Sequence, residues 1–480
     1  MKIGQVFHIL SLIIILIGFS MIPSLLISYG YKDGCVEAWS IFIILTISIA
    51  YLVYKNTRVT KEVSAKEGFC IVGLTWVVVS AIGAVPFLFS NTMPSYINAY
   101  FESMSGFSTT GASVFSNVEI LPKSILFWRS FTHWLGGMGI IVLSIIILPL
   151  LGTGGVQLFK AEAPGPTTDK LTPKIAQTAK ILWQVYVLFT LLEIILLYFG
   201  GMSWFDSACQ TFGTMATGGF STKNASIGAF NSVYIETVIM IFMVIASINF
   251  SLHFRFITGN FKTYVKNSEL VFYIVVMFIA ILLVTGNIWI SVYKNFADAF
   301  RYGSFQVISL MSTTGFTTYD FDKWPAMSKL LLIVLMFFGG CLGSTSGGVK
   351  SLRVLLILKY VGRGIKNLIY PKAVLPVKVG NEVVPKEIMS NALSFFIVAM
   401  VVFGTAVIIM ASQKLDIITS FSSVAATLWG VGPGLAKVGA AQNYAHITVI
   451  GKITLISCML LGRLEFFTII LLFSPAMWKK

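Results

Sequence analysis

Four turns that contain glycine recur along the chain, and their main chain is suited to coordinating a cation. The glycines that we take as equivalent are Gly111, Gly218, Gly315 and Gly430, separated by 107, 97 and 115 positions. A backbone that lines a narrow pore with carbonyl oxygens needs positive φ at some residues, which glycine adopts at little cost. Rings of such oxygens replace the water shell of a cation. One Thr-Thr-Gly marks an ordinary turn, but four equivalent turns predict a selectivity filter.

Each turn contributes four candidate cation-binding residues. They are Thr109, Thr110, Gly111 and Ala112 in the first turn, Ala216, Thr217, Gly218 and Gly219 in the second, Thr313, Thr314, Gly315 and Phe316 in the third, and Leu428, Trp429, Gly430 and Val431 in the fourth. The fourth turn departs most from the others, because Leu428-Trp429 stands where the first and third have Thr-Thr. This departure leaves open how its outermost and innermost sites coordinate the ion.

A short segment precedes each turn and must position it. These segments cover residues 96–108, 203–216, 296–312 and 416–428, and they are too short or too polar to cross a bilayer. Non-helical backbone at membrane depth persists only where it lines a water-filled cavity or is buried in protein. We therefore predict that these segments are re-entrant pore helices.

The composition places the chain in a membrane. Of its 480 residues 56% are hydrophobic and only 11% are charged, whereas soluble proteins carry about 25% charged residues. This excludes a soluble enzyme, a nucleic-acid-binding domain and a disordered scaffold. Ten segments are long and apolar enough to span the bilayer: residues 5–29, 38–55, 68–90, 123–151, 178–200, 231–257, 268–292, 326–349 (interrupted), 391–411 and 447–473. We interpret the first as a retained helix, because its run is too long for a signal peptide and no small-residue cleavage site follows.

Alternate connections between these segments are rich in Lys and Arg. They hold Lys55, Arg58, Lys61 and Lys66; Lys160, Lys170, Lys174 and Lys180; Arg255, Lys262 and Lys266; Lys350, Arg353, Lys359, Arg363, Lys366, Lys372, Lys378 and Lys386; and Lys479 and Lys480. The positive-inside rule then places both termini in the cytoplasm, in agreement with an even number of spans. Attraction to anionic lipid would also explain most of these charges.

Two features predict a gate below the filter. The eighth span contains five glycines within residues 339–348, and glycine costs a helix interior up to about 1 kcal/mol each. We expect an unwound loop that includes Gly343, Ser344, Thr345, Ser346 and Gly347; close packing of small residues is the alternative. Arg463 lies deep in the last span, where an ionisable group faces protein or water. Arg463 forms either a positive barrier below the filter or a structural pair with Glu465 or with Ser and Thr hydroxyls. A direct pair with Glu465 is not expected, because Glu465 lies on a different helix face.

Two carboxylates remain open in role. Glu102, in the first pore helix, either concentrates cations at the outer mouth or braces the filter through hydrogen bonds. Glu193, in the middle of the fifth span, is the one obvious candidate for ion coupling near the midplane. Arg129, His133 and Glu236 lie near helix starts, where hydrogen bonding between helices explains them as well as an ion path does.

The arrangement of span, pore helix, glycine turn and span, repeated four times, resembles the superfamily of Trk, Ktr and HKT cation transporters over the whole chain. The extra amino-terminal hairpin, residues 5–55, is similar to that of the TrkH/TrkG branch of bacterial potassium-uptake subunits. In this family glycine in all four filters goes with potassium preference, whereas serine in the first goes with sodium permeation in plant members. The resemblance also implies a gating loop in the third repeat, an arginine beside it at the place of Arg463, a homodimer in the bacterial cytoplasmic membrane and a nucleotide-binding regulator of the TrkA type.

Together these observations predict an all-α membrane protein that takes up potassium and performs no covalent chemistry. The expected units are a hairpin and four repeats: residues 1–58, 59–165, 166–262, 263–375 and 376–480. We expect no cofactor, because no nucleotide-binding glycine motif is present, and no metal site or disulfide framework, because the five cysteines lie far apart. A sodium- or proton-coupled symporter of the same fold is the alternative. A membrane-embedded enzyme is a remote one, because the four histidines are scattered.

Overall fold

The chain folds into a bundle of helices, as the sequence predicts. The computed structural model describes residues 2–58, 63–151, 175–380 and 382–478. The helices are α1 (Ile3–Ser20), α2 (Ile22–Tyr31), α3 (Val36–Asn56), α4 (Ala65–Phe89), α5 (Tyr96–Phe107), α6 (Lys123–Leu151), α8 (Ile175–Phe199), α9 (Trp204–Met215), η1 (Ser226–Phe230), α10 (Val233–Ser247), α11 (Phe250–Ile257), α12 (Lys262–Lys266), α13 (Ser268–Ser291), α14 (Phe296–Met311), η2 (Phe321–Lys323), α15 (Ala326–Phe337), α16 (Ser351–Ile369), α17 (Lys386–Ala411), α18 (Ile417–Leu428), η3 (Ala436–Val438), α19 (Val449–Arg463), α20 (Phe467–Phe473) and α21 (Pro475–Trp478). Two-residue strands β1 (Lys378–Val379) and β2 (Glu382–Val383) pair antiparallel.

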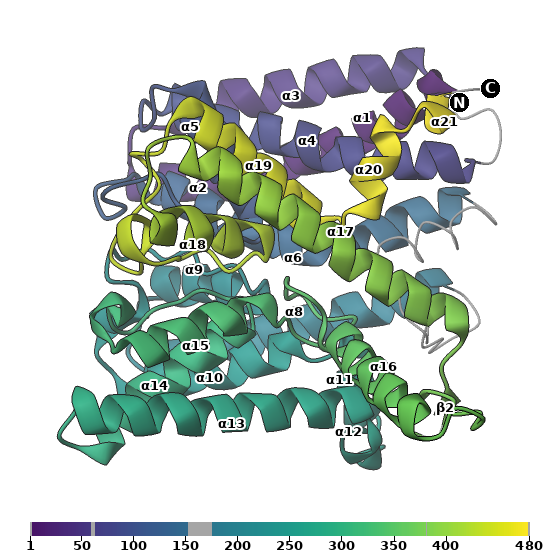
Figure 1. The fold of residues 1–480 in the computed structure, drawn as a ribbon. Coiled ribbons are helices and arrows are strands. Elements are labelled where there is room, and N and C mark those ends of the chain that lie inside the picture. The colour runs from purple at the N-terminus through teal and green to yellow at the C-terminus, as the bar shows by residue number, and fades with distance from the viewer. Residues whose placement is uncertain (1, 59–62, 152–174, 381, 479–480) are drawn as a thin grey trace.

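Some of the predicted features lie outside the described residues. These are Lys61, Lys160, Lys170, Lys174, Lys479, Lys480 and the boundaries at residues 58/59 and 165/166. In Figure 1, α3 and α13 lie at opposite edges of the bundle, and both ends of the chain lie on the side that also carries α16 and β2.

The four short helices predicted to precede the glycine turns are present as α5, α9, α14 and α18. Side-chain oxygens cap the amino-terminal ends of the last three, where Ser203, Asn295 and Asp416 accept hydrogen bonds from the first turn. These caps let each helix begin abruptly after a long apolar helix. We call α5, α9, α14 and α18 the pore helices.

The helices that flank the pore helices close into a ring. Within each repeat the preceding long helix packs on the pore helix, in the pairs α4 with α5, α8 with α9, α13 with α14 and α17 with α18. The helix after each turn packs on the pore helix of the next repeat, in the pairs α6 with α9, α10 with α14, α15 with α18 and α19 with α5. Because the last pair returns to the first repeat, the four repeats surround one axis, and the hairpin packs outside this ring through α1 on α4 and α2 on α6.

The helices are consistent with the ten predicted spans. Among the described residues, six helices are long and apolar enough to cross a membrane, and two bent helix pairs also qualify. The fourth predicted span corresponds to α6, with 29 residues. The eighth, residues 326–349, corresponds to α15 and the non-helical residues 338–350, which separate α15 from α16. We call residues 338–350 the intramembrane loop.

The sixth predicted span is not a continuous helix. Its two parts, α10 and α11, meet at an angle of 105°, because Ile248 and Asn249 are extended and Asn249 caps α11. The break leaves the last carbonyl groups of α10 free of helical partners. The carbonyl oxygens of Ala246 and Ser247 instead accept hydrogen bonds from the intramembrane loop. The prediction of a continuous helix was wrong, since a partner from another repeat satisfies the backbone at the bend.

The tenth predicted span is also broken. Helices α19 and α20 meet at 117°, and Glu465 and Phe466 between them have φ values of 56° and 55°. Helix α19 therefore ends at Arg463, which places this side chain at a helix terminus beside the intramembrane loop rather than within a straight helix.

Candidate functional site

The four segments that follow the pore helices share one backbone conformation. We call residues 108–112, 216–220, 312–316 and 429–433 the filter loops. In each loop the second and fourth residues have positive φ: Thr109 (55°) and Gly111 (84°), Thr217 (53°) and Gly219 (79°), Thr313 (59°) and Gly315 (79°), and Gly430 (68°) and Gly432 (95°). Positive φ at alternate residues turns successive peptide planes in different directions, which an extended segment lining a pore requires.

The hydrogen bonds of the loops repeat in the same way. The amide of the third residue in each loop donates to the carbonyl oxygen five residues earlier in its pore helix. The pairs are Thr110 to Ser105 (2.9 Å), Gly218 to Gly213 (2.8 Å), Thr314 to Ser309 (2.9 Å) and Val431 to Ala426 (2.8 Å). This bond is typical of a helix that ends in a left-handed residue, and it fixes the register of the four loops independently of their side chains.

The structure corrects the register in two of the four turns. The residues equivalent to Gly111 are Gly219 and Gly432 rather than Gly218 and Gly430. Gly430-Val431 therefore stands where the first loop has Thr-Thr. Leu428, which we predicted in the filter, is the last residue of α18, and Trp429 is its C-cap and only the first residue of the fourth filter loop.

Gly218 is a glycine for another reason. Its φ is not positive, but a Cβ atom there would lie 2.5 Å from Cγ of His133. Two adjacent glycines, each required by a different constraint, are indistinguishable in a sequence.

The filter loops meet around the axis of the ring. A Cβ atom on the fourth residue of each loop would collide with the carbonyl oxygen of the third residue in the next loop. The pairs are Gly111 with Gly218, Gly219 with Thr314, Gly315 with Val431, and Gly432 with Thr110. The cycle closes on the first loop, so carbonyl groups from four distant parts of the chain form one ring. The carboxyl ends of the four pore helices also meet here, and their dipoles add negative potential that favours a cation.

A buried ion pair braces the first filter loop. The carboxylate of Glu102 accepts hydrogen bonds from Nε of Arg129 (2.5 Å), Oγ of Ser113 (3.0 Å) and the amide of Val114 (2.9 Å). Glu102 is fully buried, so the structure supports the bracing role and argues against attraction of cations at the mouth. Arg129 also donates to the carbonyl oxygen of Ser221 (3.0 Å) and thereby joins the first loop to the second.

Removing this carboxylate tests the bracing role. We expect Glu102→Ala to lower the free energy of unfolding by about 3–5 kcal/mol, because it leaves the Arg129 charge buried without its partner. Thermal unfolding of the purified protein in detergent measures the effect. Glu37→Ala removes an exposed carboxylate of α3 and is the matched control. Equal unfolding temperatures for the two variants would contradict the assignment.

Other braces come from residues that sequence reasoning did not single out. Gln210, at the place in α9 that Glu102 has in α5, donates through Nε2 to Oγ of Ser221 (2.8 Å). Tyr444 donates through its hydroxyl to the carbonyl oxygen of Gly432 (2.8 Å) and through its amide to that of Ser113 (2.8 Å). Burial raises the pKa of the Tyr444 hydroxyl, which therefore remains a donor. A tyrosine in a long polar loop carries no local pattern that would predict this contact.

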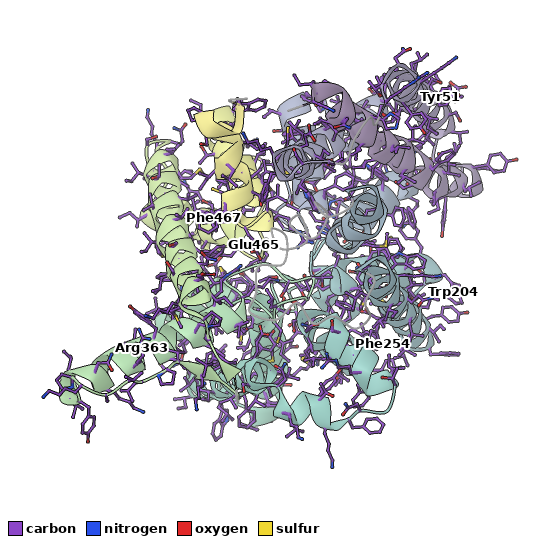
Figure 2. All side chains as sticks on the ribbon, turned by 90° about the vertical axis from the view of Figure 1, so that its right-hand side faces the viewer. Tyr51, Trp204, Phe254, Arg363, Glu465 and Phe467 are labelled. Atoms are coloured by element: carbon purple, nitrogen blue, oxygen red, sulfur yellow. The ribbon has the colours of Figure 1, made fainter. Side chains whose placement is uncertain are left out.

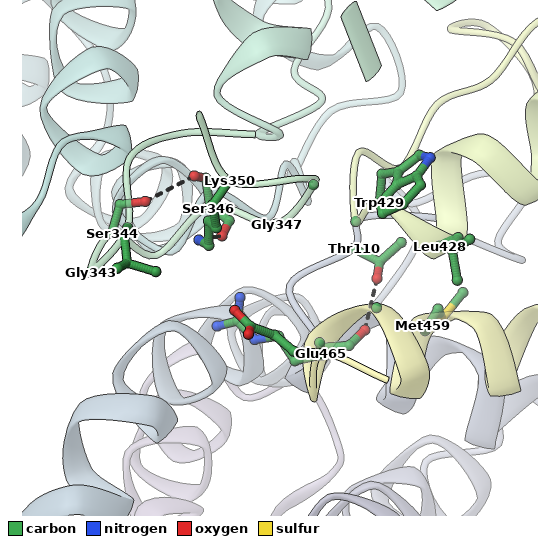
Figure 3. Close-up of a pocket in the computed structure, with 16 residues that line it drawn as sticks. Thr110, Gly343, Ser344, Ser346, Gly347, Lys350, Leu428, Trp429, Met459 and Glu465 are labelled. Carbon is green, nitrogen blue, oxygen red and sulfur yellow. Dashed lines mark hydrogen bonds between the residues drawn. The ribbon is translucent and has the colours of Figure 1, made fainter. Parts of the chain in front are cut away.

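Cavities lie on both sides of the carbonyl ring. The outer cavity, of about 150 Å³, is lined by Gly111, Gly219, Gly315 and Gly432 from the four loops and by Arg129 and Tyr444. The inner cavity, of about 60 Å³, is lined by Thr110 and Gly430, by the intramembrane loop and by Arg463 (Figure 3). The ring is thus the narrow part of a path from one cavity to the other.

The intramembrane loop is bonded directly to the filter. Oγ1 of Thr345 donates to the carbonyl oxygen of Met215 (2.9 Å), at the end of the second pore helix. The amide of Gly347 donates to Oγ1 of Thr313 (2.7 Å), and the amide of Gly348 donates to the carbonyl oxygen of Trp429 (2.9 Å). The end of the second pore helix and the third and fourth filter loops therefore hold the intramembrane loop against the inner side of the ring.

Arg463 holds the same loop from the other side. Its guanidinium donates to the carbonyl oxygen of Thr345 (2.9 Å) and to that of Gly136 in α6 (2.9 Å). Glu465 pairs with Arg353 (2.6 Å), and it lies in the break after α19 rather than on another face of a continuous helix. Figure 2 shows Glu465 near the centre of this end of the bundle.

One further carboxylate joins the intramembrane loop to the first turn of α16. Oε1 of Glu269, at the start of α13, accepts hydrogen bonds from the amides of Leu342 (2.6 Å) and Leu352 (3.1 Å). Sequence reasoning missed Glu269, because a carboxylate in the first turn of a helix is an ordinary feature. Its role depends on residues more than 70 positions away.

Glu193 is buried and remains without an assigned partner. Neither carboxylate oxygen has a hydrogen-bond partner among the described residues. Glu236, by contrast, forms a two-bond ion pair with Arg301 (2.7 Å each) and has a structural role.

Known proteins resemble the chain along its whole length. Residues 36–292 and 263–480 match the TrkH family, described as cation transport protein. The chain is 41% identical over 478 residues to the Trk system potassium uptake protein TrkH of Escherichia coli K12, covering 98% of this chain and 99% of that protein. It is 33% identical over 476 residues to the Trk system potassium uptake protein TrkG of the same strain, covering 98% of each. The crystal structure of the potassium transporter TrkH from Vibrio parahaemolyticus superimposes with a TM-score of 0.91 at 35% identity, covering 100% of both chains.

Proposed function

The chain belongs to the TrkH family of cation transport proteins, and from this premise we propose that it takes up potassium across a membrane through the ring of four filter loops. The observation that carries this proposal is the closed cycle of glycines and carbonyl oxygens. A dehydrated cation at the ring exchanges its water for carbonyl oxygens. The work of the protein is this exchange, without covalent chemistry, and the relatives are named as potassium uptake proteins.

The intramembrane loop and Arg463 form the gate of this path. Support comes from the loop's hydrogen bonds to Thr313 and Trp429, and from the guanidinium that ties Thr345 to α6. A positive charge below the ring repels a cation that leaves it. Opening requires the loop to release these bonds and Arg463 to move aside.

The protein crosses the membrane several times. We place it in the bacterial cytoplasmic membrane with both termini in the cytoplasm. The basic connections support this orientation, and both ends of the chain lie on one side of the bundle (Figure 1).

The partners that we propose are a second copy of the chain and a cytoplasmic nucleotide-binding regulator of the TrkA type. The second half of α16 supports a docking role, because it projects from the bundle at Arg363 (Figure 2) and exposes apolar side chains such as Leu358 and Ile365 beside its charges. Contact of the same surface with anionic lipid is the alternative.

A coupled symporter is the second candidate. Glu193 supports it, since a fully buried carboxylate without a hydrogen-bond partner near a pore helix is suited to carry a proton. A pH gradient imposed on potassium-loaded liposomes distinguishes the two mechanisms, because only a coupled transporter moves potassium against its own gradient.

Flux through the purified protein in liposomes tests the proposed function. We expect potassium and rubidium to enter and sodium to be excluded. Gly111→Ser is expected to lose the discrimination against sodium, because a side chain there meets the carbonyl oxygen of Gly218 and distorts the ring. Gly362→Ser, where a Cβ atom meets nothing within 4 Å in α16, is the control. Unchanged selectivity and rate in Gly111→Ser would refute the filter assignment.

A further inference from the structure

An apolar cavity of about 330 Å³ lies between the amino-terminal hairpin and the pore-forming helices. Its walls come from α1, α4, α6 and α8 and from Phe107, the last residue of the first pore helix. An apolar cavity of about 150 Å³ is large enough to bind benzene. This one is therefore large enough for a longer hydrocarbon.

The polar atoms of the cavity wall leave little for water to bind. The hydroxyl groups of Ser20 and Thr75 donate to carbonyl oxygens of their own helices (2.7 Å each), and Nε1 of Trp183 donates to Sδ of Met138 (2.7 Å). Nε1 of Trp76 is the one side-chain donor of the wall without a partner among the described residues. A buried water needs two to four polar partners, so the cavity is suited to hydrocarbon rather than to water.

The cavity reaches the apolar outer surface of the bundle. Leu16 and Trp183 line it and are 45% and 37% exposed. Both belong to helices that are apolar enough to cross a membrane. At the inner end, Trp76, Val79 and Phe107 are buried. The cavity therefore leads from the lipid-facing surface toward the first pore helix.

The inner end of the cavity also touches the residues that hold Arg463. The guanidinium of Arg463 lies 5.8 Å from the ring centre of Trp76 and donates to the carbonyl oxygen of Gly136 (2.9 Å). Trp76 and Gly136 both line the cavity. A molecule in the cavity would therefore contact two groups that position the arginine.

We propose that this cavity binds one acyl chain of a membrane phospholipid and that its occupancy sets the position of Arg463. The acyl chain enters between Leu16 and Trp183 and packs against Trp76. The effect on the arginine rests on the proposed role of Arg463 in gating, whereas the binding itself does not.

Photo-crosslinking tests the binding. The probe is a phosphatidylcholine with a diazirine midway along one acyl chain, mixed into liposomes that hold the full chain, and mass spectrometry locates the label. We expect label on Trp76, Val79 or Phe107, and its loss in Leu16→Trp, which closes the entrance. Leu26→Trp places the same side chain at an exposed position of α2 outside the cavity and should keep the label. Label confined to exposed residues, or unchanged in Leu16→Trp, would overturn the proposal.

Rubidium flux through the same liposomes tests the effect on the arginine. Leu16→Trp is expected to change flux at least about fivefold, the lower end of typical coupling between two sites, and Leu26→Trp is expected to leave it unchanged. Flux that is equal in the two variants, with label lost only in Leu16→Trp, would overturn the link to Arg463. If no variant transports rubidium, labelling of the buried residues still decides whether the acyl chain binds in the cavity. Failure of the proposed function is therefore distinguished from failure of this site.

Discussion

Replacing Gly432 by Ala is expected to reduce potassium uptake by about tenfold or more, whereas replacing Gly430 by Thr should leave it nearly unchanged. Gly432 has a φ of 95°, and a Cβ atom there would lie 2.6 Å from the carbonyl oxygen of Thr110. This φ lies beyond the left-handed region of about 50–70° that other residues adopt. Forcing alanine into it costs about 1–3 kcal/mol, and about 1.4 kcal/mol corresponds to a factor of ten. The collision with an oxygen of the ring adds to this cost where the ion binds.

Gly430 differs from Gly432 although both have positive φ. A Cβ atom on Gly430 meets nothing within 4 Å. The equivalent residues of the other three loops are threonines with φ values of 53–59°. Gly430→Thr thus reproduces what three loops already contain, and it serves as the matched variant for Gly432→Ala.

Uptake in cells that lack their own potassium transporters measures both variants, with the amount of membrane-inserted protein as the control. A strong loss in Gly430→Thr together with normal uptake in Gly432→Ala would show that the register predicted from the sequence is correct and that the structural register is wrong.

Replacing Arg463 by Ala is expected to increase potassium flux about tenfold or more in liposomes without a regulator. The substitution removes the positive charge below the ring and the hydrogen bonds to Thr345 and Gly136. A hydrogen bond from a charged group contributes about 1.5–3 kcal/mol, so their loss weakens the hold on the intramembrane loop at Thr345. The bonds of the loop to the filter, to the end of α10 and to Glu269 remain.

Arg363→Ala is the control for this experiment, because it removes a charge from the projecting part of α16 (Figure 2). The variants are compared at equal protein content, and valinomycin gives the maximal potassium flux of each preparation. If Arg463→Ala conducts no faster than the unmodified protein, Arg463 is a structural residue and the gate lies elsewhere.

The sequence was sufficient to locate the pore helices. Residues 96–108 and 416–428 were predicted and helices Tyr96–Phe107 and Ile417–Leu428 are observed. These segments are recognisable because each is bounded by a long apolar run on one side and a glycine turn on the other. The interruption of the eighth span was equally visible, because glycine is a poor helix former.

The register of the filter loops was only partly predictable. In the first and third loops, a single glycine follows Thr-Thr, so only one residue fits the position of the filter glycine. The second loop has Gly218-Gly219 and the fourth has Gly430 and Gly432, so the pattern allows more than one alignment. The choice depends on the positions of His133 and Thr110, which are distant in the chain.

By itself, the sequence determined that this is a helical membrane protein, and it located the four pore helices and the interruption of the eighth span. Those properties follow from the length and polarity of local segments, because a bilayer accepts a helix that is long and apolar enough whatever the rest of the fold. The tertiary structure decided which glycine faces which carbonyl oxygen, where α10 and α19 bend, and which groups Glu102, Glu269 and Arg463 bind. Buried polar groups must find partners, and in a ring of four repeats those partners come from other repeats, so no local pattern contains them.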